Sequence, residues 1–247
     1  INMKITSKIL AVLAISAAFT SALTAGVTVS RDSDIKDFAI NSVDGSSFHF
    51  GVHAEGGTRA MEYNGTEMDV DVSRYVAFLG YDISRSMTLF VTMGTMVSEP
   101  DSDAIFALNT EDNNSFTAGA GLMVNLIDSD QFDFLTTISR YRLQADAEVY
   151  YADFEDYSWV EFDAALTFQL HNEDAINNTQ ILPDQYALFA GPCVSVVSSD
   201  EFDQGSGNVF GIKGGISLIF TSNTYLTGGF EYYGDSSLYY GTIGVRF

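Results

Sequence analysis

The sequence predicts an all-β fold, an antiparallel up-and-down β-barrel of ten strands, with eight strands as the alternative. Three observations predict it. Apolar and polar residues alternate over unusually long runs, which is typical of strands with two different faces. The composition is rich in residues that suit pleated surfaces, with 19 Phe and 13 Tyr against only 3 Pro. Short turns also separate some of these runs, whereas longer acidic loops separate others.

Residues 3–26 have the layout of a secretory signal peptide. Lys4 and Lys8 form a positive region, an apolar region of 11 residues covers 9–19, and small residues follow as far as Gly26. This apolar region is too short for a membrane-spanning helix, which needs ~20 residues. We therefore expect a cleaved signal peptide over 3–26, a leader segment over 27–46 and a single barrel domain over 47–247.

Charge and cysteine content exclude several classes of protein. The net charge is −22, and removal of Lys4 and Lys8 with the signal peptide leaves 9 basic residues against 33 acidic ones, a net charge of −24. Such a chain repels phosphates, so we expect no nucleic-acid partner. The single Cys193 excludes an intramolecular disulfide. No stretch after residue 26 approaches 18 apolar residues, so the sequence predicts no membrane-spanning helix.

The alternation is clearest over residues 140–151, a run of roughly 40 Å at ~3.3 Å per residue. One face is polar and carries Arg140, Arg142, Gln144, Asp146 and Glu148, while the other carries Tyr141, Leu143, Ala145, Ala147, Val149 and Tyr151. The same reasoning predicts ten strands, at about 47–62, 66–82, 87–98, 116–127, 132–151, 157–170, 185–198, 207–220, 225–233 and 237–247.

The connections alternate in length, with two exceptions. Short turns are predicted at 83–86, 128–131 and 221–224, and long acidic loops at 99–115 and 198–208. The connection 171–184 is long where a short turn is expected, whereas Asn64-Gly65 predicts a tight hairpin where a long loop is expected. Pro192 lies inside the seventh strand and cannot donate to the ladder, so we expect a bulge there.

Two architectures fit alternating strands. A soluble secreted β-sandwich or lipocalin-like barrel would bury the apolar face, whereas a transmembrane barrel turns it toward lipid. Long strands, unequal connections and aromatic residues near strand ends favour the transmembrane β-barrel. These aromatic residues are Phe116, Tyr141, Tyr151, Phe168, Phe210, Phe220, Tyr232 and Tyr239. The last strand must then pair with the first, near residues 48–60, because an open edge is not tolerated in lipid.

The chain ends in LYYGTIGVRF, with apolar or aromatic residues at Tyr239, Ile243, Val245 and the terminal Phe247. Together with the signal peptide, this ending resembles the small outer-membrane β-barrel proteins of Gram-negative bacteria, although Gly241 lies one place from the usual glycine. The resemblance implies that these four residues form the signal read by the barrel assembly machinery. It also implies export to the outer membrane and a monomer in contact with outer-membrane lipid and lipopolysaccharide. No subfamily is assigned.

Charged residues on the polar faces predict a lumen that is largely plugged by ion pairs. Narrow barrels are filled by side chains, and buried charges need partners. The predicted luminal cluster consists of Arg140, Arg142, Asp146, Glu148, Glu161, Asp163, Lys213 and Glu231. We expect Arg246 to reach only the periplasmic interface. A narrow ion path is the alternative use of these charges.

The sequence contains no convincing catalytic set. His49 and His53 share a face with Glu55, but residues four apart in a strand lie ~13 Å apart, too far to bind one metal ion alone. His171 is predicted at a turn.

Asp69 and Asp71 share a face near a strand end, as carboxylates do in the barrel proteases called omptins. The Asp-x-His pattern that would supply the base is absent, as is the His-x-Ser pattern of lipid A deacylases. The acidic loops do not match a calcium loop. We therefore expect no catalytic residue, metal ion or cofactor.

These observations predict a structural, surface-interaction or minor pore role in the outer membrane. The alternatives are a soluble secreted β-sandwich, a lipocalin-like ligand-binding barrel, or a small barrel enzyme.

Overall fold

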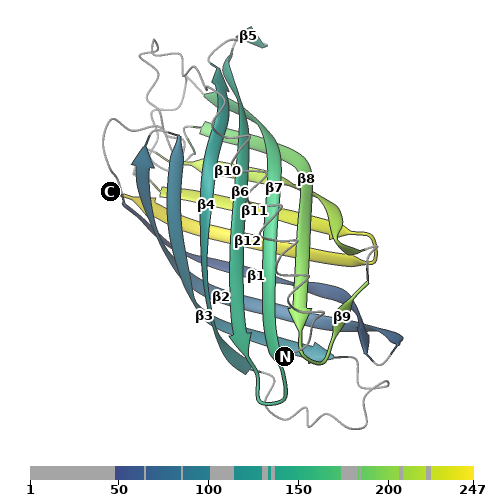
Figure 1. The fold of residues 1–247 in the computed structure, drawn as a ribbon. Helices are drawn as coiled ribbons and strands as arrows, with labels where there is room; N and C mark the ends of the chain where they lie inside the picture. Colours follow the sequence, from purple (N-terminus) through teal and green to yellow (C-terminus); the bar gives the residue numbers. More distant parts are fainter. Residues whose placement is uncertain are drawn as a thin grey trace.

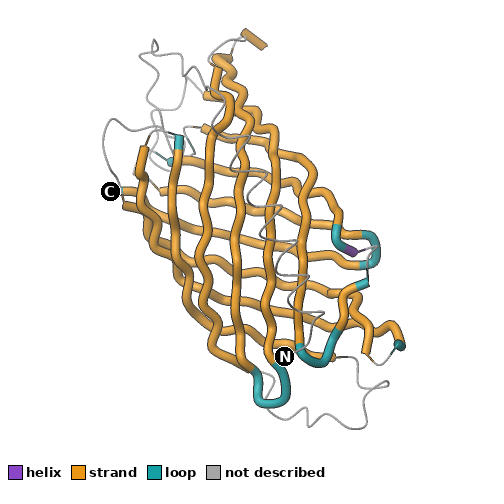
Figure 2. The backbone as a smooth tube through the Cα atoms, in the orientation of Figure 1, coloured by secondary structure: helices purple, strands orange, loops and turns teal. Residues whose placement is uncertain are grey.

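The chain folds into one closed antiparallel barrel (Figures 1 and 2). The computed structural model describes residues 48–63, 65–84, 86–100, 114–129, 133–134, 137–173, 183, 185–205, 208–220 and 224–247. In this part of the chain, ten long strands each pair with their neighbours in sequence order. The last strand then pairs with the first, from His49 opposite Arg246 to Thr58 opposite Ser237, and no edge is left open along this stretch. The predicted barrel and its strand count are confirmed.

The ten long strands are β1 (Phe48–Tyr63), β2 (Thr66–Ser84), β3 (Met87–Pro100), β4 (Asn114–Ser129), β6 (Thr137–Asp153), β7 (Ser158–Glu173), β8 (Gln185–Ser199), β10 (Phe210–Ile219), β11 (Thr224–Tyr233) and β12 (Ser236–Arg246). Two short strands accompany them. β5 (Asp133–Phe134) pairs with the start of β6, and β9 (Asp203–Gln204) pairs with the end of β1.

The barrel has two distinct ends. The terminal end carries the first residue of β1 and the last of β12, and the backbone N–H of Phe247 donates to the carbonyl of Phe48 there at 2.9 Å. The far end carries the turns at Gly65, 154–157 and 234–235. Figure 1 shows β5 near the terminal end and β9 at the far end.

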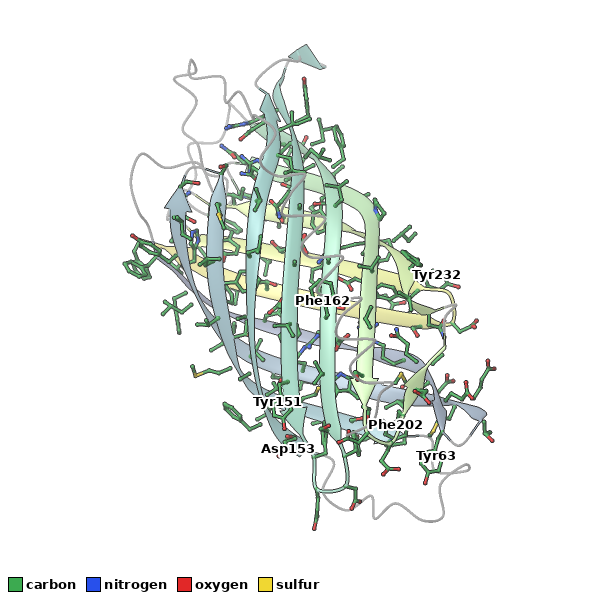
Figure 3. The ribbon with its side chains drawn as sticks, viewed as in Figure 1. Tyr63, Tyr151, Asp153, Phe162, Phe202 and Tyr232 are labelled. Atoms are coloured by element: carbon green, nitrogen blue, oxygen red, sulfur yellow. The ribbon has the colours of Figure 1, made fainter. Side chains whose placement is uncertain are left out.

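The outer face of the barrel is apolar. Many of its exposed aromatic residues lie near one end or the other: Phe116, Tyr151, Phe210, Tyr232 and Tyr239 near the far end, and Phe48, Tyr81, Phe168, Tyr186 and Phe247 near the terminal end. Figure 3 labels Tyr151 and Tyr232 of this set. Aliphatic side chains such as Val52, Met93 and Leu188 are exposed between them. A surface this apolar is expected in lipid rather than in water.

This arrangement excludes two of the alternatives. The strands form one closed sheet rather than two packed sheets, so the chain is not a β-sandwich. Many large apolar side chains are exposed on the outer face, whereas charged residues such as Arg59 and Glu161 are buried inside, which is the reverse of a lipocalin-like barrel. The fold is therefore of the transmembrane β-barrel type. In the described part of the chain, no helix combines the length and apolarity that a membrane span requires.

Local features follow from particular residues. Tyr63 pairs with Thr66 across a two-residue turn in which Gly65 has φ of +81°, so the predicted hairpin is confirmed. The bulge predicted at Pro192 is wrong, because Ala165–Cys193 and Phe168–Ala190 keep the same register on either side of it. The ladder is instead interrupted there. The register shifts lie between Asp82 and Ser84 in β2 and between Asn125 and Ile127 in β4.

Some predicted boundaries also differ. The strand predicted over 132–151 begins at Thr137 and runs to Asp153, while β5 is separate. The connection predicted over 171–184 starts later, because β7 continues to Glu173 and places His171 inside a strand rather than at a turn. The signal peptide over 3–26, the leader over 27–46 and most of the loop 99–115 lie outside the described residues.

Candidate functional site

The lumen is the candidate site, and its far end is apolar. A cluster of buried residues, here called the far-end cluster, fills it: Met61, Met68, Val70, Val72, Met96, Ala152, Phe154, Tyr157, Trp159, Ala165, Cys193, Val197, Phe202, Tyr233 and Leu238. Trp159 is 0% exposed. Alternation explains how these residues point inward, since the inner positions of β2 near its start are Met68, Val70 and Val72.

The loop between β8 and β10 contributes to this cluster. The sequence predicts an acidic external loop over 198–208, but Phe202 within it is only 2% exposed. Its ring meets Tyr157 edge-on at 5.1 Å between ring centroids and lies 5.9 Å from Tyr63 (Figure 3). β9 fixes the loop to β1, where Gln204 pairs with Met61. Burial raises the pKa of the Tyr157 hydroxyl in the neighbouring turn, which keeps it neutral.

A charged layer, here called the charge network, lies next to the far-end cluster. It consists of Glu55, Arg59, Arg74, Asp146, Glu148, Glu161, Asp163, Lys213 and Glu231. These residues come from six strands, and pairs such as Arg59 with Glu161 join strands that are not neighbours in the sheet.

Glu161 and two arginines form one half of the charge network. Arg59 Nη2 binds Glu161 Oε1, and Arg74 Nη1 lies 3.4 Å from Glu161 Oε2. Arg74 also pairs with Glu55 at 2.7 Å, and its guanidinium lies 3.4 Å from the centroid of the Tyr150 ring. Arg74 thus binds two carboxylates and stacks on a ring, while Arg59 binds Glu161, and buried charges need such partners.

Lys213 organises the other half of the charge network. Its Nζ lies 3.0 Å from Glu231 Oε1 and 3.5 Å from Asp146 Oδ2. Glu231 also accepts a hydrogen bond of 2.5 Å from the Tyr233 hydroxyl. Lys213 and Glu231 are direct partners across β10 and β11, so the ladder register itself brings the two charges together.

Separate ion pairs lie at the terminal end. Asp82 binds His49 at 2.9 Å and Arg246 at 3.0 Å, so Arg246 faces the lumen instead of the periplasmic interface expected for it. Asp128 binds both Arg140 and Arg142.

The structure thus divides the predicted luminal cluster. Asp146, Glu148, Glu161, Asp163, Lys213 and Glu231 lie in the charge network, whereas Arg140 and Arg142 lie apart from it beside Asp128. Sequence reasoning missed Arg59 and Arg74. Arg59 has the same parity in β1 as His49, His53 and Glu55, and that signal could have placed it in the lumen.

The catalytic candidates are also dispersed. Asp69 and Asp71 are exposed on the outer face of β2, and Thr58 donates a hydrogen bond of 2.7 Å to Asp71. His53 Nδ1 lies 2.8 Å from the Thr242 hydroxyl, and His171 bonds Gln169. Among the described residues, no group of three His, Cys, Asp or Glu is arranged to hold a metal ion.

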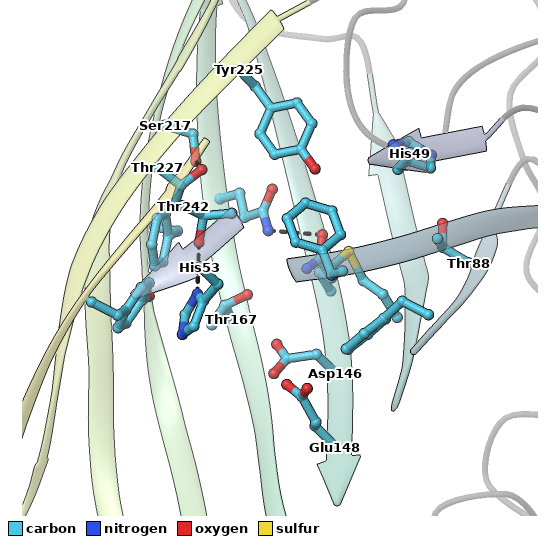
Figure 4. Close-up of a pocket in the computed structure, with 18 of the residues that line it drawn as sticks. His49, His53, Thr88, Asp146, Glu148, Thr167, Ser217, Tyr225, Thr227 and Thr242 are labelled. Atoms are coloured by element: carbon cyan, nitrogen blue, oxygen red, sulfur yellow. Dashed lines mark hydrogen bonds between the residues drawn. The ribbon is translucent and has the colours of Figure 1, made fainter. Parts of the chain in front are cut away.

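A cavity of about 230 Å³ lies between the charge network and the terminal end. Polar lining residues include His53, Gln144, Asp146, Glu148, Thr167 and Lys213, and apolar ones include Phe78, Phe90, Met123, Phe189, Ile219 and Tyr225. No residue of the far-end cluster lines it. Figure 4 shows Asp146 and Glu148 projecting into it from β6, with His53 bonded to Thr242 nearby.

No protein-family model matches the chain. The curated proteins compared with it yield no match either.

Several solved structures are similar in fold. The translocator domain of the autotransporter NalP from Neisseria meningitidis is 12% identical, with 82% of this chain and 88% of that chain covered and a TM-score of 0.34. An outer membrane channel from Pseudomonas putida F1 is 11% identical, with 87% and 100% covered and a TM-score of 0.37. The transport unit of the autotransporter AIDA-I from Escherichia coli is 10% identical, with 92% and 96% covered and a TM-score of 0.33.

Proposed function

We propose that this chain is an integral outer-membrane β-barrel whose lumen is closed to ion flow, with a structural or surface-interaction role. The observation that carries the proposal is the pairing of an apolar outer face with a lumen that contains the far-end cluster and the charge network. The outer face suits lipid, while the apolar side chains of the far-end cluster oppose conduction.

The predicted topology supports the orientation. An N-terminus in the periplasm and an even number of strands return Phe247 to the periplasm, so the terminal end faces inward and the far end faces outward. The barrel would be exported by its signal peptide and inserted as a monomer among outer-membrane lipid and lipopolysaccharide. The assembly machinery would recognise Tyr239, Ile243, Val245 and Phe247. We assign no catalytic role. His49, His53 and His171 bond Asp82, Thr242 and Gln169, whereas Asp69 and Asp71 are exposed on the outer face.

A minor pore is the second candidate, favoured by the cavity in the terminal half of the lumen. Conductance across a planar lipid bilayer separates the two roles. We expect no current steps from the refolded chain, and steps from a Trp159→Ala, Phe202→Ala double variant that removes two large rings from the far-end cluster. The matched control is Phe116→Ala, Phe210→Ala, which truncates aromatic residues on the outer face. Steady conductance by the unaltered chain would establish the minor pore instead.

Cell fractionation tests the location. We expect the chain to sediment with outer membranes and to migrate faster on gels before heating than after. Recovery in the soluble periplasm would contradict the proposal.

A further inference from the structure

The charge network contains more carboxyl groups than permanently charged cations. It holds six carboxylates against three permanent cations, a surplus of three. His53 lies 3.7 Å from Glu55, and even if it carried a proton two negative charges would remain. Buried charges are costly without partners, so each surplus carboxyl group must either hold a proton or meet a further positive group.

Glu148 is the carboxylate where that surplus meets the cavity. It lines the cavity beside Asp146 and lies opposite Asp163 across β6 and β7. The Tyr150 hydroxyl bonds its carboxyl group, but Oε1 is buried and has no hydrogen-bond partner among the described residues. No described Lys, Arg or His nitrogen lies within ion-pair distance of Glu148, whereas Lys213 is already shared by Asp146 and Glu231.

Other polar atoms around the same cavity are also unpaired. The hydroxyls of Thr92, Thr167 and Tyr240 line it, are buried, and have no hydrogen-bond partner among the described residues. Buried polar groups are normally satisfied by protein, water or ligand. Several such atoms around one cavity therefore indicate an occupant that can both donate and accept hydrogen bonds.

The walls limit what this occupant can be. Phe78, Phe90 and Phe189 give the cavity apolar walls, which a bare metal ion would not use. The volume of about 230 Å³ is below the ~300–1,000 Å³ of pockets for drug-sized ligands. Aromatic walls beside a carboxylate are also a favourable setting for an organic cation.

We propose that the cavity is a binding site for a small organic amine, with its ammonium group on Glu148 and its apolar body against the phenylalanine walls. Entry is from the terminal end, because the lining extends to Ile219 and Tyr225 there while the far-end cluster contributes nothing to it. The site is independent of whether the barrel conducts.

Calorimetric titration of the full chain, refolded in detergent, tests this with phenethylamine as the probe. The neutral 3-phenylpropanol and the anionic 3-phenylpropionate are probes of similar size. We expect phenethylamine to bind at least tenfold more tightly than either, because a charge-assisted hydrogen bond is lost in both. Two results would contradict an amine site: 3-phenylpropanol binding as tightly as phenethylamine, or no binding of phenethylamine at all.

Glu148→Gln is the informative variant, since it removes the charge and keeps the size. We expect it to weaken phenethylamine binding about tenfold or more. Glu67→Gln is the matched control, because Glu67 is exposed at the start of β2, near the far end of the barrel. This variant should bind phenethylamine as tightly as the unaltered chain does. Heat-modifiable migration confirms that each variant folds.

Two results would overturn the assignment even if binding occurs. Unchanged amine affinity in folded Glu148→Gln would place the amine elsewhere. A thermal shift produced by sodium or calcium chloride, dependent on Glu148 and unmatched by phenethylamine, would establish an inorganic ion site instead.

Discussion

Glu161 joins the two chemically different layers of the lumen. Its carboxylate accepts hydrogen bonds from Arg59 and Arg74, and from Ser195 Oγ at 3.2 Å. The indole Nε1 of Trp159 donates to it at 3.3 Å. One buried acid thus holds the charge network against the far-end cluster, and its loss would leave two guanidinium groups without their main partner.

Replacing Glu161 by alanine should therefore lower the free energy of unfolding by about 3–5 kcal/mol, the cost of removing one partner from a buried pair. Urea unfolding of the chain in lipid vesicles measures it. Glu67→Ala removes an exposed acid of the same type and should change the free energy by less than about 0.5 kcal/mol. Equal effects of the two variants would show that Glu161 does not join the layers.

At the scale of the strands, β7 and β8 make a close backbone contact beside Pro192. A Cβ atom at Gly191 would lie 1.9 Å from the carbonyl oxygen of Leu166. The interrupted ladder at Pro192 therefore coincides with a contact that only glycine permits.

Gly191→Ala should therefore destabilise the barrel by about 2 kcal/mol or more, because backbone must move to admit the methyl group. Gly241→Ala is the matched control, since the nearest atom to its Cβ would be 4.0 Å away, at the Thr227 carbonyl oxygen. Thermal unfolding of both variants in the same detergent provides the measurement. A Gly191→Ala barrel as stable as the control would contradict the close contact.

The end of β12 yields a prediction about assembly. Phe247 is 76% exposed, so its ring adds little packing to the folded barrel. If the ring is read by the assembly machinery, Phe247→Ala should reduce the heat-modifiable fraction in cells several-fold while leaving the unfolding free energy of the refolded barrel nearly unchanged.

Phe210→Ala controls for the loss of any exposed aromatic ring, as Phe210 is 74% exposed at the opposite end of the barrel. Equal cellular yields of the two variants would mean that the terminal ring is not the signal.

At the scale of the whole molecule, the strands and their closure follow from the sequence, since alternation over long runs is local information. The arrangement of side chains in the interior is harder to predict from the sequence. The first half of β2 carries Met68, Val70 and Val72 on its luminal face, so its alternation resembles a lipid-facing pattern and conceals Arg74. The pairing of Arg140 and Arg142 with Asp128 depends on the register of β4 and β6, which alternation alone does not fix.

The inward fold of the β8–β10 loop was also missed. Its acidic residues predict a solvated loop, but the single aromatic Phe202 decides its position, because burying that ring against Tyr157 outweighs leaving the loop in water.

We expect the outer face of this barrel to lie in lipid while its interior does not. The chain has one tryptophan, Trp159, which is buried in the lumen. Met93 is exposed midway along β3, so Met93→Trp adds a second indole on the outer face. Fluorescence in vesicles of lipids brominated in their acyl chains compares the two positions directly. We predict little quenching of the unaltered chain and strong quenching of the emission added by Met93→Trp. Added emission that is quenched no more than that of Trp159 would show that the outer face does not lie in lipid.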